Sequence, residues 1–128
     1  MYEVLHGATT IWEGWDAVGE DGTLRALSLN HYAPGSALSW LFSRCAGIRA
    51  GAPGYQKILI EPHPGGTLTF ADASYQSPVG LITSAWEIRD GRFELHVTLP
   101  ERVPAVIVMP DHSRIEDAVS GTYSCGWE

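Results

Sequence analysis

The hydrophobic pattern in the first half of the chain is helical between residues 30 and 48. Five side chains recur at the spacing of one helix face: Leu38, Leu41, Phe42, Cys45 and Ile48. Pro34 fits the first turn, where its missing N–H costs least, and Gly47 stands where a left-handed C-terminal cap is usual. The pattern therefore predicts one helix over residues 34–46.

Beyond residue 55 the pattern changes to short β-rich runs. Seven runs of β-branched and aromatic residues alternate with Pro and Gly: QKILIEP, LTFADASYQS, GLITSAWEIR, RFELHVTLP, AVIVMP, RIEDAVS and GTYSCGW. Strands at this spacing predict an antiparallel β-sandwich. The preceding segment RAGAPGYQ, residues 49–56, is rich in Gly and Pro and is interpreted as a linker.

The strongest turn signal is the dipeptide Asp90-Gly91, which suits a two-residue type I′ hairpin. Such a turn predicts the pairs Arg89 with Arg92, Ile88 with Phe93, Trp86 with Leu95, Ser84 with Val97 and Ile82 with Leu99. In this register the apolar side chains of both strands share one face, as a buried sheet face requires. Glu87 then stands opposite Glu94 on the other face, which we expect to be wet.

Length and charge narrow the possible roles. The 128 residues form one domain, or one small domain with an appendage, and can bury a core without disulfides. Fifteen acidic residues oppose eight dispersed basic ones, which argues against nucleic acid and anionic membranes as partners. No basic segment followed by an apolar run opens the chain, so a cytoplasmic location is expected unless a longer parent chain carries a signal.

Cysteine and histidine spacing indicates neither disulfides nor metal. Cys45 and Cys125 lie far apart without close Cys or His companions, so they are interpreted as reduced, buried thiols. The five histidines include no pair at metal-ligand spacing, and no metal site is predicted.

Candidate chemistry lies near the start of the chain. In GATTIWEGW, residues 7–15, Glu13 stands between Trp12 and Trp15, whose rings can bind the C–H face of a sugar and partly desolvate the acid. Glycoside hydrolysis uses such a carboxylate as one of a pair. His31, in SLNHYAPG, can donate a hydrogen bond to a sugar hydroxyl. The alternative is structural: a surface Glu beside two core rings, and a His in a structural hydrogen bond.

Three ordered motifs resemble the C-terminal end of bacterial α-L-rhamnosidases: GATTIWEGWD, SLNHYAPGS with WLFSRCAGIR, and GYQKILIEPHPGGTLTFADASYQSPVGLITSAWE. The similarity covers nearly the whole chain and thins after about Pro100. It implies a mainly β fold, with a C-terminal antiparallel β-sandwich preceded by a helical remnant of an (α/α)6 barrel. Residues 1–54 would end the catalytic barrel, and residues 55–128 would form the sandwich.

The resemblance also implies an activity and roles for single residues. These enzymes hydrolyse terminal α-L-rhamnosyl groups with inversion and without a metal or other cofactor. The resemblance implies that Glu13 is the general base that activates water. It also implies that His31 and Trp12 line the sugar pocket. Gly14 stands where the family usually has a larger residue such as Arg, and Pro34 stands where it usually has an aromatic residue. The general acid lies upstream in the family, so we expect the chain alone to be inactive.

Two further interpretations stay open. A non-catalytic carbohydrate-binding module would expose aromatic residues on one sandwich face, and Tyr75, Trp86, Tyr123 and Trp127 are available, although the predicted hairpin places Trp86 in the core. The predicted helix also carries a Leu/Phe face with nothing obvious to cover it. That face would contact a missing upstream barrel, its own sandwich, or a second copy of the chain.

Overall fold

The structure, a computed structural model, describes residues 2–25 and 27–127. It divides into two compact units, Met1–Ser39 and Trp40–Glu128. The larger unit contains the strands β1 (Ile48–Ala50), β2 (Ile58–Ile60), β3 (Phe70–Ser77), β4 (Gly80–Arg89), β5 (Arg92–Thr98), β6 (Ala105–Val108), β7 (Arg114–Ile115) and β8 (Gly121–Gly126). They form two four-stranded sheets, in the orders β1-β2-β6-β7 and β3-β4-β5-β8.

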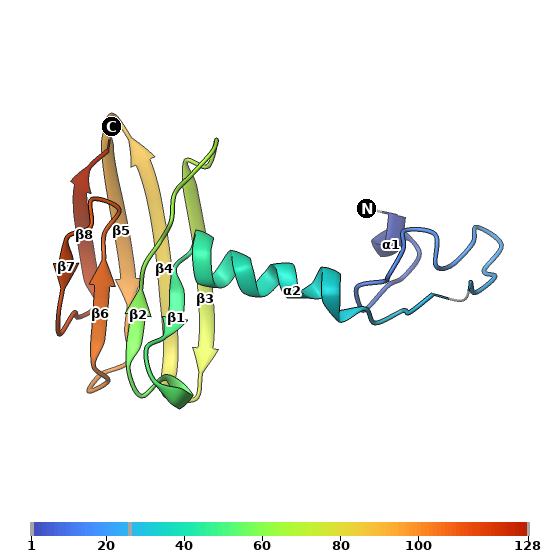
Figure 1. Cartoon of the computed structure of the whole chain (residues 1–128), viewed down its shortest axis with the longest axis horizontal. Coiled ribbons are helices and arrows are strands. Elements are labelled where there is room, and N and C mark those ends of the chain that lie inside the picture. Colours follow the sequence, from blue (N-terminus) through green and yellow to red (C-terminus); the bar gives the residue numbers. More distant parts are fainter. Residues whose placement is uncertain (1, 26, 128) are drawn as a thin grey trace. The chain divides into compact units, whose positions relative to one another are not determined.

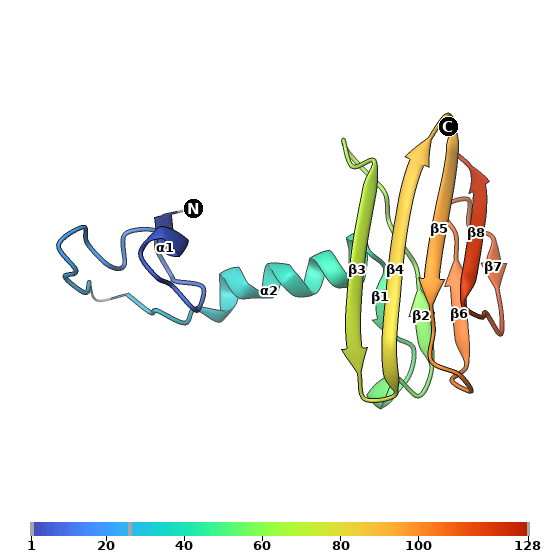
Figure 2. The ribbon, with the colours of Figure 1, turned by 180° about the vertical axis from the view of Figure 1, so that it is seen from behind.

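The two sheets are the two layers of a sandwich (Figures 1 and 2). Both contribute fully buried side chains to one core, among them Ile58, Ile60 and Ile107 from the first sheet and Ile82, Phe93 and Leu95 from the second. The predicted mainly β fold with a C-terminal sandwich is therefore confirmed. No helix among the described residues is long and apolar enough to cross a membrane.

The hairpin of β4 and β5 has the predicted register. Asp90 and Gly91 have φ values of 52° and 71°, as a type I′ turn requires, and the observed pairs run from Arg89 with Arg92 to Thr83 with Thr98. Glu87 pairs with Glu94 on the outer face, as predicted. The predicted pair of Ile82 with Leu99 lies just beyond this ladder, although both side chains are buried.

The start of the predicted linker is a strand. β1 pairs antiparallel with β2, and Ile48 is buried in the common core. The linker interpretation is wrong for this part, because a three-residue edge strand is too short to show a period in sequence. The predicted boundary after residue 54 accordingly lies inside the larger unit, whose first residue is Trp40.

One pair of strands is parallel rather than antiparallel. β2 pairs in parallel with β6, whereas every other pair in the two sheets is antiparallel. The chain leaves the first sheet after β2, builds β3, β4 and β5 of the second sheet, and then returns to β6. Parallel neighbours need such a long crossover, which here is made of strands.

The predicted helix is present and begins two residues earlier than expected. It comprises α2 (Tyr32–Trp40) followed directly by the π-helical turn η1 (Leu41–Cys45). Gly47 has a φ of 80°, in the predicted left-handed conformation. A Cβ atom there would lie 2.2 Å from the backbone nitrogen of Pro62, so only glycine fits. Two shorter helical turns are α1 (Tyr2–Leu5) and η2 (Pro53–Tyr55).

The end of this helix is held by the sandwich through its last carbonyl groups. Four consecutive carbonyls accept hydrogen bonds: Arg44 from the His63 amide at 3.0 Å, Cys45 from Trp86 Nε1 at 2.7 Å, Ala46 from Ser84 Oγ at 2.6 Å, and Gly47 from the Glu61 amide at 2.9 Å. Helix ends leave such carbonyls without internal partners. The sandwich thus satisfies them, with two amides of the segment after β2 and with the buried side chains of Ser84 and Trp86 on β4.

Both cysteines are free thiols. Cys45 is buried at the helix end, as predicted, whereas Cys125 on β8 is only half-buried. Burial raises the pKa of the Cys125 thiol above its usual value.

Candidate functional site

Two predicted motifs of the smaller unit lie side by side through backbone hydrogen bonds. The amide of Glu13 donates to the carbonyl of Ser28 at 2.8 Å, and the amide of His31 donates to the carbonyl of Ile11 at 2.8 Å. The structure therefore brings Glu13 and His31 together, although they stand far apart in the sequence.

The carboxylate of Glu13 is oriented by the segment that carries His31. Its Oε2 atom accepts a hydrogen bond from the amide of Ser28 at 2.8 Å. The Nδ1 atom of His31 lies 3.9 Å from the same oxygen, and the two side chains are 36% and 40% exposed for His31 and Glu13. Among the described residues no hydrogen bond is formed by the other oxygen, Oε1, so it can accept a proton from water.

The two tryptophans beside Glu13 have opposite surroundings. Trp12 is 6% exposed and belongs to the small core of its unit, whereas Trp15 is 71% exposed. Trp15 lines an open surface depression together with Asp16 and Arg25, which form an ion pair at 2.6 Å. The role of Trp12 in a sugar pocket stays a prediction, and of these two tryptophans Trp15 is the one that is open to solvent.

Ser28 is the contributor that the sequence analysis missed. It acts through its backbone amide and carbonyl, which every residue type provides. No side-chain pattern signals a backbone donor. Only the pairing of the two segments, seen in the structure, reveals it.

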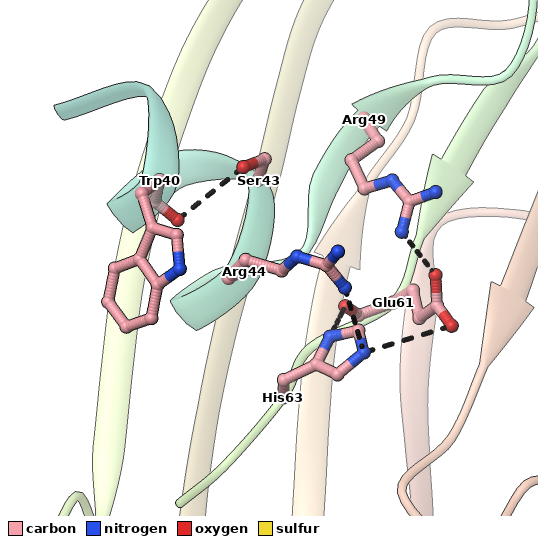
Figure 3. Close-up of polar contacts among 6 residues, drawn as sticks. All are labelled: Trp40, Ser43, Arg44, Arg49, Glu61 and His63. Carbon is pink, nitrogen blue, oxygen red and sulfur yellow. Dashed lines mark hydrogen bonds and ion pairs between the residues drawn. The ribbon is translucent and has the colours of Figure 1, made fainter. Parts of the chain in front are cut away.

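A second polar cluster lies beside the helix end in the larger unit (Figure 3). Arg49 Nη1 binds Glu61 Oε2 at 2.6 Å. The Nδ1 atom of His63 lies 2.8 Å from the Glu61 carbonyl, and because a carbonyl only accepts, Nδ1 carries the proton. The Nε2 atom of His63 then faces Arg44 Nη1 at 3.4 Å and Glu61 Oε1 at 3.9 Å. The cluster links the helix end to the segment after β2.

This helix end has one further local contact. The Ser43 hydroxyl lies 3.5 Å from the Trp40 carbonyl, while the Trp40 side chain is 57% exposed (Figure 3).

Within residues 2–25 and 27–127, no three His, Cys, Asp or Glu side chains are arranged to hold a metal ion.

The family follows from two matches that share the chain. Residues 47–128 match the bacterial alpha-L-rhamnosidase C-terminal domain, and residues 1–45 match the six-hairpin glycosidase domain of bacterial alpha-L-rhamnosidases. The chain belongs to the bacterial α-L-rhamnosidase family. It contains the C-terminal region of such a protein, and the two matches meet at the helix end near Cys45.

Proteins named alpha-L-rhamnosidase are similar to this chain over most of its length. An alpha-L-rhamnosidase of Streptomyces avermitilis is 37% identical over 126 residues, which cover 95% of the chain. One from Formosa agariphila is 38% identical over 113 residues, or 86% of the chain. In both cases the chain spans only 12% of the length of the relative.

Solved rhamnosidase structures share the fold. The native α-L-rhamnosidase of Aspergillus terreus superposes with a TM-score of 0.75 at 32% identity, over 98% of this chain and 15% of its own. The Streptomyces avermitilis enzyme complexed with L-rhamnose gives a TM-score of 0.68 at 34% identity, over 98% of this chain and 14% of its own.

Proposed function

We propose that this chain is the C-terminal part of an α-L-rhamnosidase that hydrolyses terminal α-L-rhamnosyl residues with inversion. Glu13 acts as the general base: it takes a proton from the water that attacks the anomeric carbon, while a second carboxyl group protonates the leaving oxygen. The observation that supports this role is the Glu13 carboxylate, held through Oε2 by the Ser28 amide at 2.8 Å with Oε1 left for water. His31 and Trp12 are proposed as residues of the sugar pocket.

The proposed site contains one half of the required pair. An inverting enzyme separates its two carboxyl groups by about 6.5–9.5 Å so that water fits between base and sugar. The described contacts of Glu13 involve Ser28 and His31 and no second carboxylate. We infer that the acid comes from the part of the enzyme that this chain, at 12% of its relatives' length, does not span, and that the chain alone is inactive.

The exposed side chains of the helix also favour a partner from the part of the enzyme that this chain does not span. Its apolar side chains are open to solvent, with Leu38 53%, Trp40 57% and Leu41 47% exposed. We propose that the remainder of a six-hairpin domain covers them. Light scattering tests the alternative, since pairing with a second copy would double the mass as concentration rises.

A chimeric enzyme tests the role of Glu13. This chain replaces the matching C-terminal 12% of the Streptomyces avermitilis relative, and release of 4-nitrophenol from 4-nitrophenyl α-L-rhamnoside gives the rate. We expect Glu13→Gln to lower kcat by about 10²–10⁴-fold, the usual contribution of acid–base catalysis. Glu20→Gln, an exposed acid of the same unit, is the matched control and retains the rate.

Two results would contradict the proposal. The first is a chimera in which Glu13→Gln turns over at the unmodified rate. The second is hydrolysis by the purified 128-residue chain at the rate of an intact enzyme, which would mean that one carboxylate suffices.

A further inference from the structure

A small cavity of about 190 Å³ opens on the surface of the larger unit, and none of its lining residues belongs to the proposed catalytic site. It is lined by the segment after β2, the turn after β6 and the residue that follows β8. Three prolines form part of its wall: Pro62, Pro64 and Pro110. Proline has a fixed φ, so this wall is rigid, and a ligand that binds there orders little backbone.

The polar groups of the cavity are held in place before any ligand binds. Glu61 and His63 both line it. Arg49 binds Glu61 Oε2, and the Nδ1–H of His63 donates to the Glu61 carbonyl (Figure 3). These contacts fix the orientation of both side chains. Glu61 Oε1 and His63 Nε2 keep capacity for further hydrogen bonds. They make only longer contacts, at 3.9 Å with each other and at 3.4 Å between His63 Nε2 and Arg44 Nη1.

Trp127 supplies an aromatic surface to the same cavity. Its ring centroid lies 6.3 Å from that of the buried Phe93, and its amide donates to the Gly91 carbonyl at 2.9 Å. The ring is therefore supported by the core. Among the described residues, no hydrogen bond is formed by the indole N–H of Trp127, which is thus available to a ligand.

His112 lines the cavity from a turn that favours glycine. Its φ is 67°, in the left-handed region that a side chain with a Cβ atom enters at a cost. Hydrogen bonds within residues 109–113 hold this geometry: the His112 amide donates to the Met109 carbonyl at 2.9 Å, and the Met109 amide donates to the Ser113 carbonyl at 2.9 Å. These two hydrogen bonds fix the turn that places the exposed His112 beside the cavity.

We propose that this cavity binds one pyranose ring of a neutral glycan. The ring would lie against Trp127, as sugar C–H faces do on aromatic surfaces, with its hydroxyls bound by Glu61, His63 and His112. Cavities for drug-sized ligands measure roughly 300–1,000 Å³, so 190 Å³ suits a single sugar unit. Arg49 balances the charge of Glu61, which favours a neutral ligand. This site shares no residue with the proposed catalytic site and does not depend on the proposed hydrolysis.

The other aromatic candidates of the sandwich are less suited. Trp86 is 2% exposed and its N–H is bound to Cys45. The Tyr123 hydroxyl donates to the Val119 carbonyl, and Tyr75 packs on Tyr55 with ring centroids 5.2 Å apart. Of the four aromatic residues considered for sugar binding, Trp127 is the one that lines this cavity.

Titration of the isotope-labelled chain, followed by ¹H–¹⁵N NMR, tests the proposal. The probes are L-rhamnose, D-galactose and D-glucose, each up to about 50 mM because single sugars bind in the millimolar range. We expect saturable shifts of the Trp127 indole resonance and of the amides of residues 109–113 with at least one of these sugars. Trp127→Ala abolishes them, whereas Trp15→Ala, at an exposed tryptophan outside the cavity, leaves them unchanged.

His112→Gly separates binding from folding. Glycine enters the left-handed conformation freely, so we expect an unchanged fold by NMR and about tenfold weaker binding, the loss of one hydrogen bond. Arg102→Gly makes the same backbone change at a φ of 63° outside the cavity and retains full affinity. The proposal is overturned if no sugar gives saturable shifts at the cavity, or if His112→Gly binds as tightly as the unmodified chain.

Discussion

Replacing Trp86 with phenylalanine removes one donor from the helix end and keeps an aromatic ring in the core. The Trp86 side chain is 2% exposed, and its ring centroid lies 5.5 Å from that of Phe93. Its Nε1 atom donates to the Cys45 carbonyl at 2.7 Å. The substitution therefore tests whether the sandwich stabilises the helix through this hydrogen bond.

The expected loss has two parts. Leaving the buried Cys45 carbonyl without a partner costs about 1–3 kcal/mol. The smaller ring also leaves a void, and loss of packed atoms from a core typically costs about 1 kcal/mol or more. We expect the free energy of unfolding to fall by about 2–4 kcal/mol, a large share of the roughly 5–15 kcal/mol that stabilise a typical domain.

Urea unfolding followed by far-UV circular dichroism measures this loss. Trp15→Phe is the matched control: Trp15 is 71% exposed, so its replacement should change stability by less than about 0.5 kcal/mol. Ser84→Ala, which frees the adjacent Ala46 carbonyl, should cost about 1–3 kcal/mol. If Trp86→Phe loses no more than the Trp15 control, the argument that the sheet holds the helix end is refuted.

Three further changes test other parts of the fold. Gly47→Ala should prevent folding or lower the melting midpoint sharply, because its Cβ would lie 2.2 Å from the Pro62 nitrogen; soluble yield and thermal unfolding measure this. Glu87→Thr should raise stability by about 0.2–1 kcal/mol in urea unfolding, since Glu87 faces Glu94 across the hairpin and its exposed ion pair with Arg89 contributes little. Burial raises the pKa of the Cys125 thiol, so less thiolate is present at pH 8, and iodoacetamide should modify it more slowly in the native chain than in urea. A destabilised Glu87→Thr or equal alkylation rates would contradict the respective expectation.

Local chemistry was enough to predict the central hairpin. The Asp90-Gly91 turn sets the register, and because side chains alternate between faces, the turn also decides which residues are buried. The helix and its glycine cap followed from spacing in the same way, since a helix contacts itself every three to four residues. The family followed from motifs that stand in order along the chain, which needs no knowledge of contacts. The roles of Glu13 and His31 came from that resemblance and stay predictions.

The tertiary structure decided whatever depends on segments that are distant in sequence. β1 is a strand because β2 lies beside it. Its three residues are too few to show the alternation of apolar and polar side chains that predicts a strand. The Ser28 amide holds Glu13, and the Cys45 carbonyl holds Trp86, through backbone atoms that all residue types share. The cavity around Trp127 gathers three separate segments of the chain. The sequence by itself determined local conformation and ancestry, whereas these contacts exist only once the fold has brought their partners together.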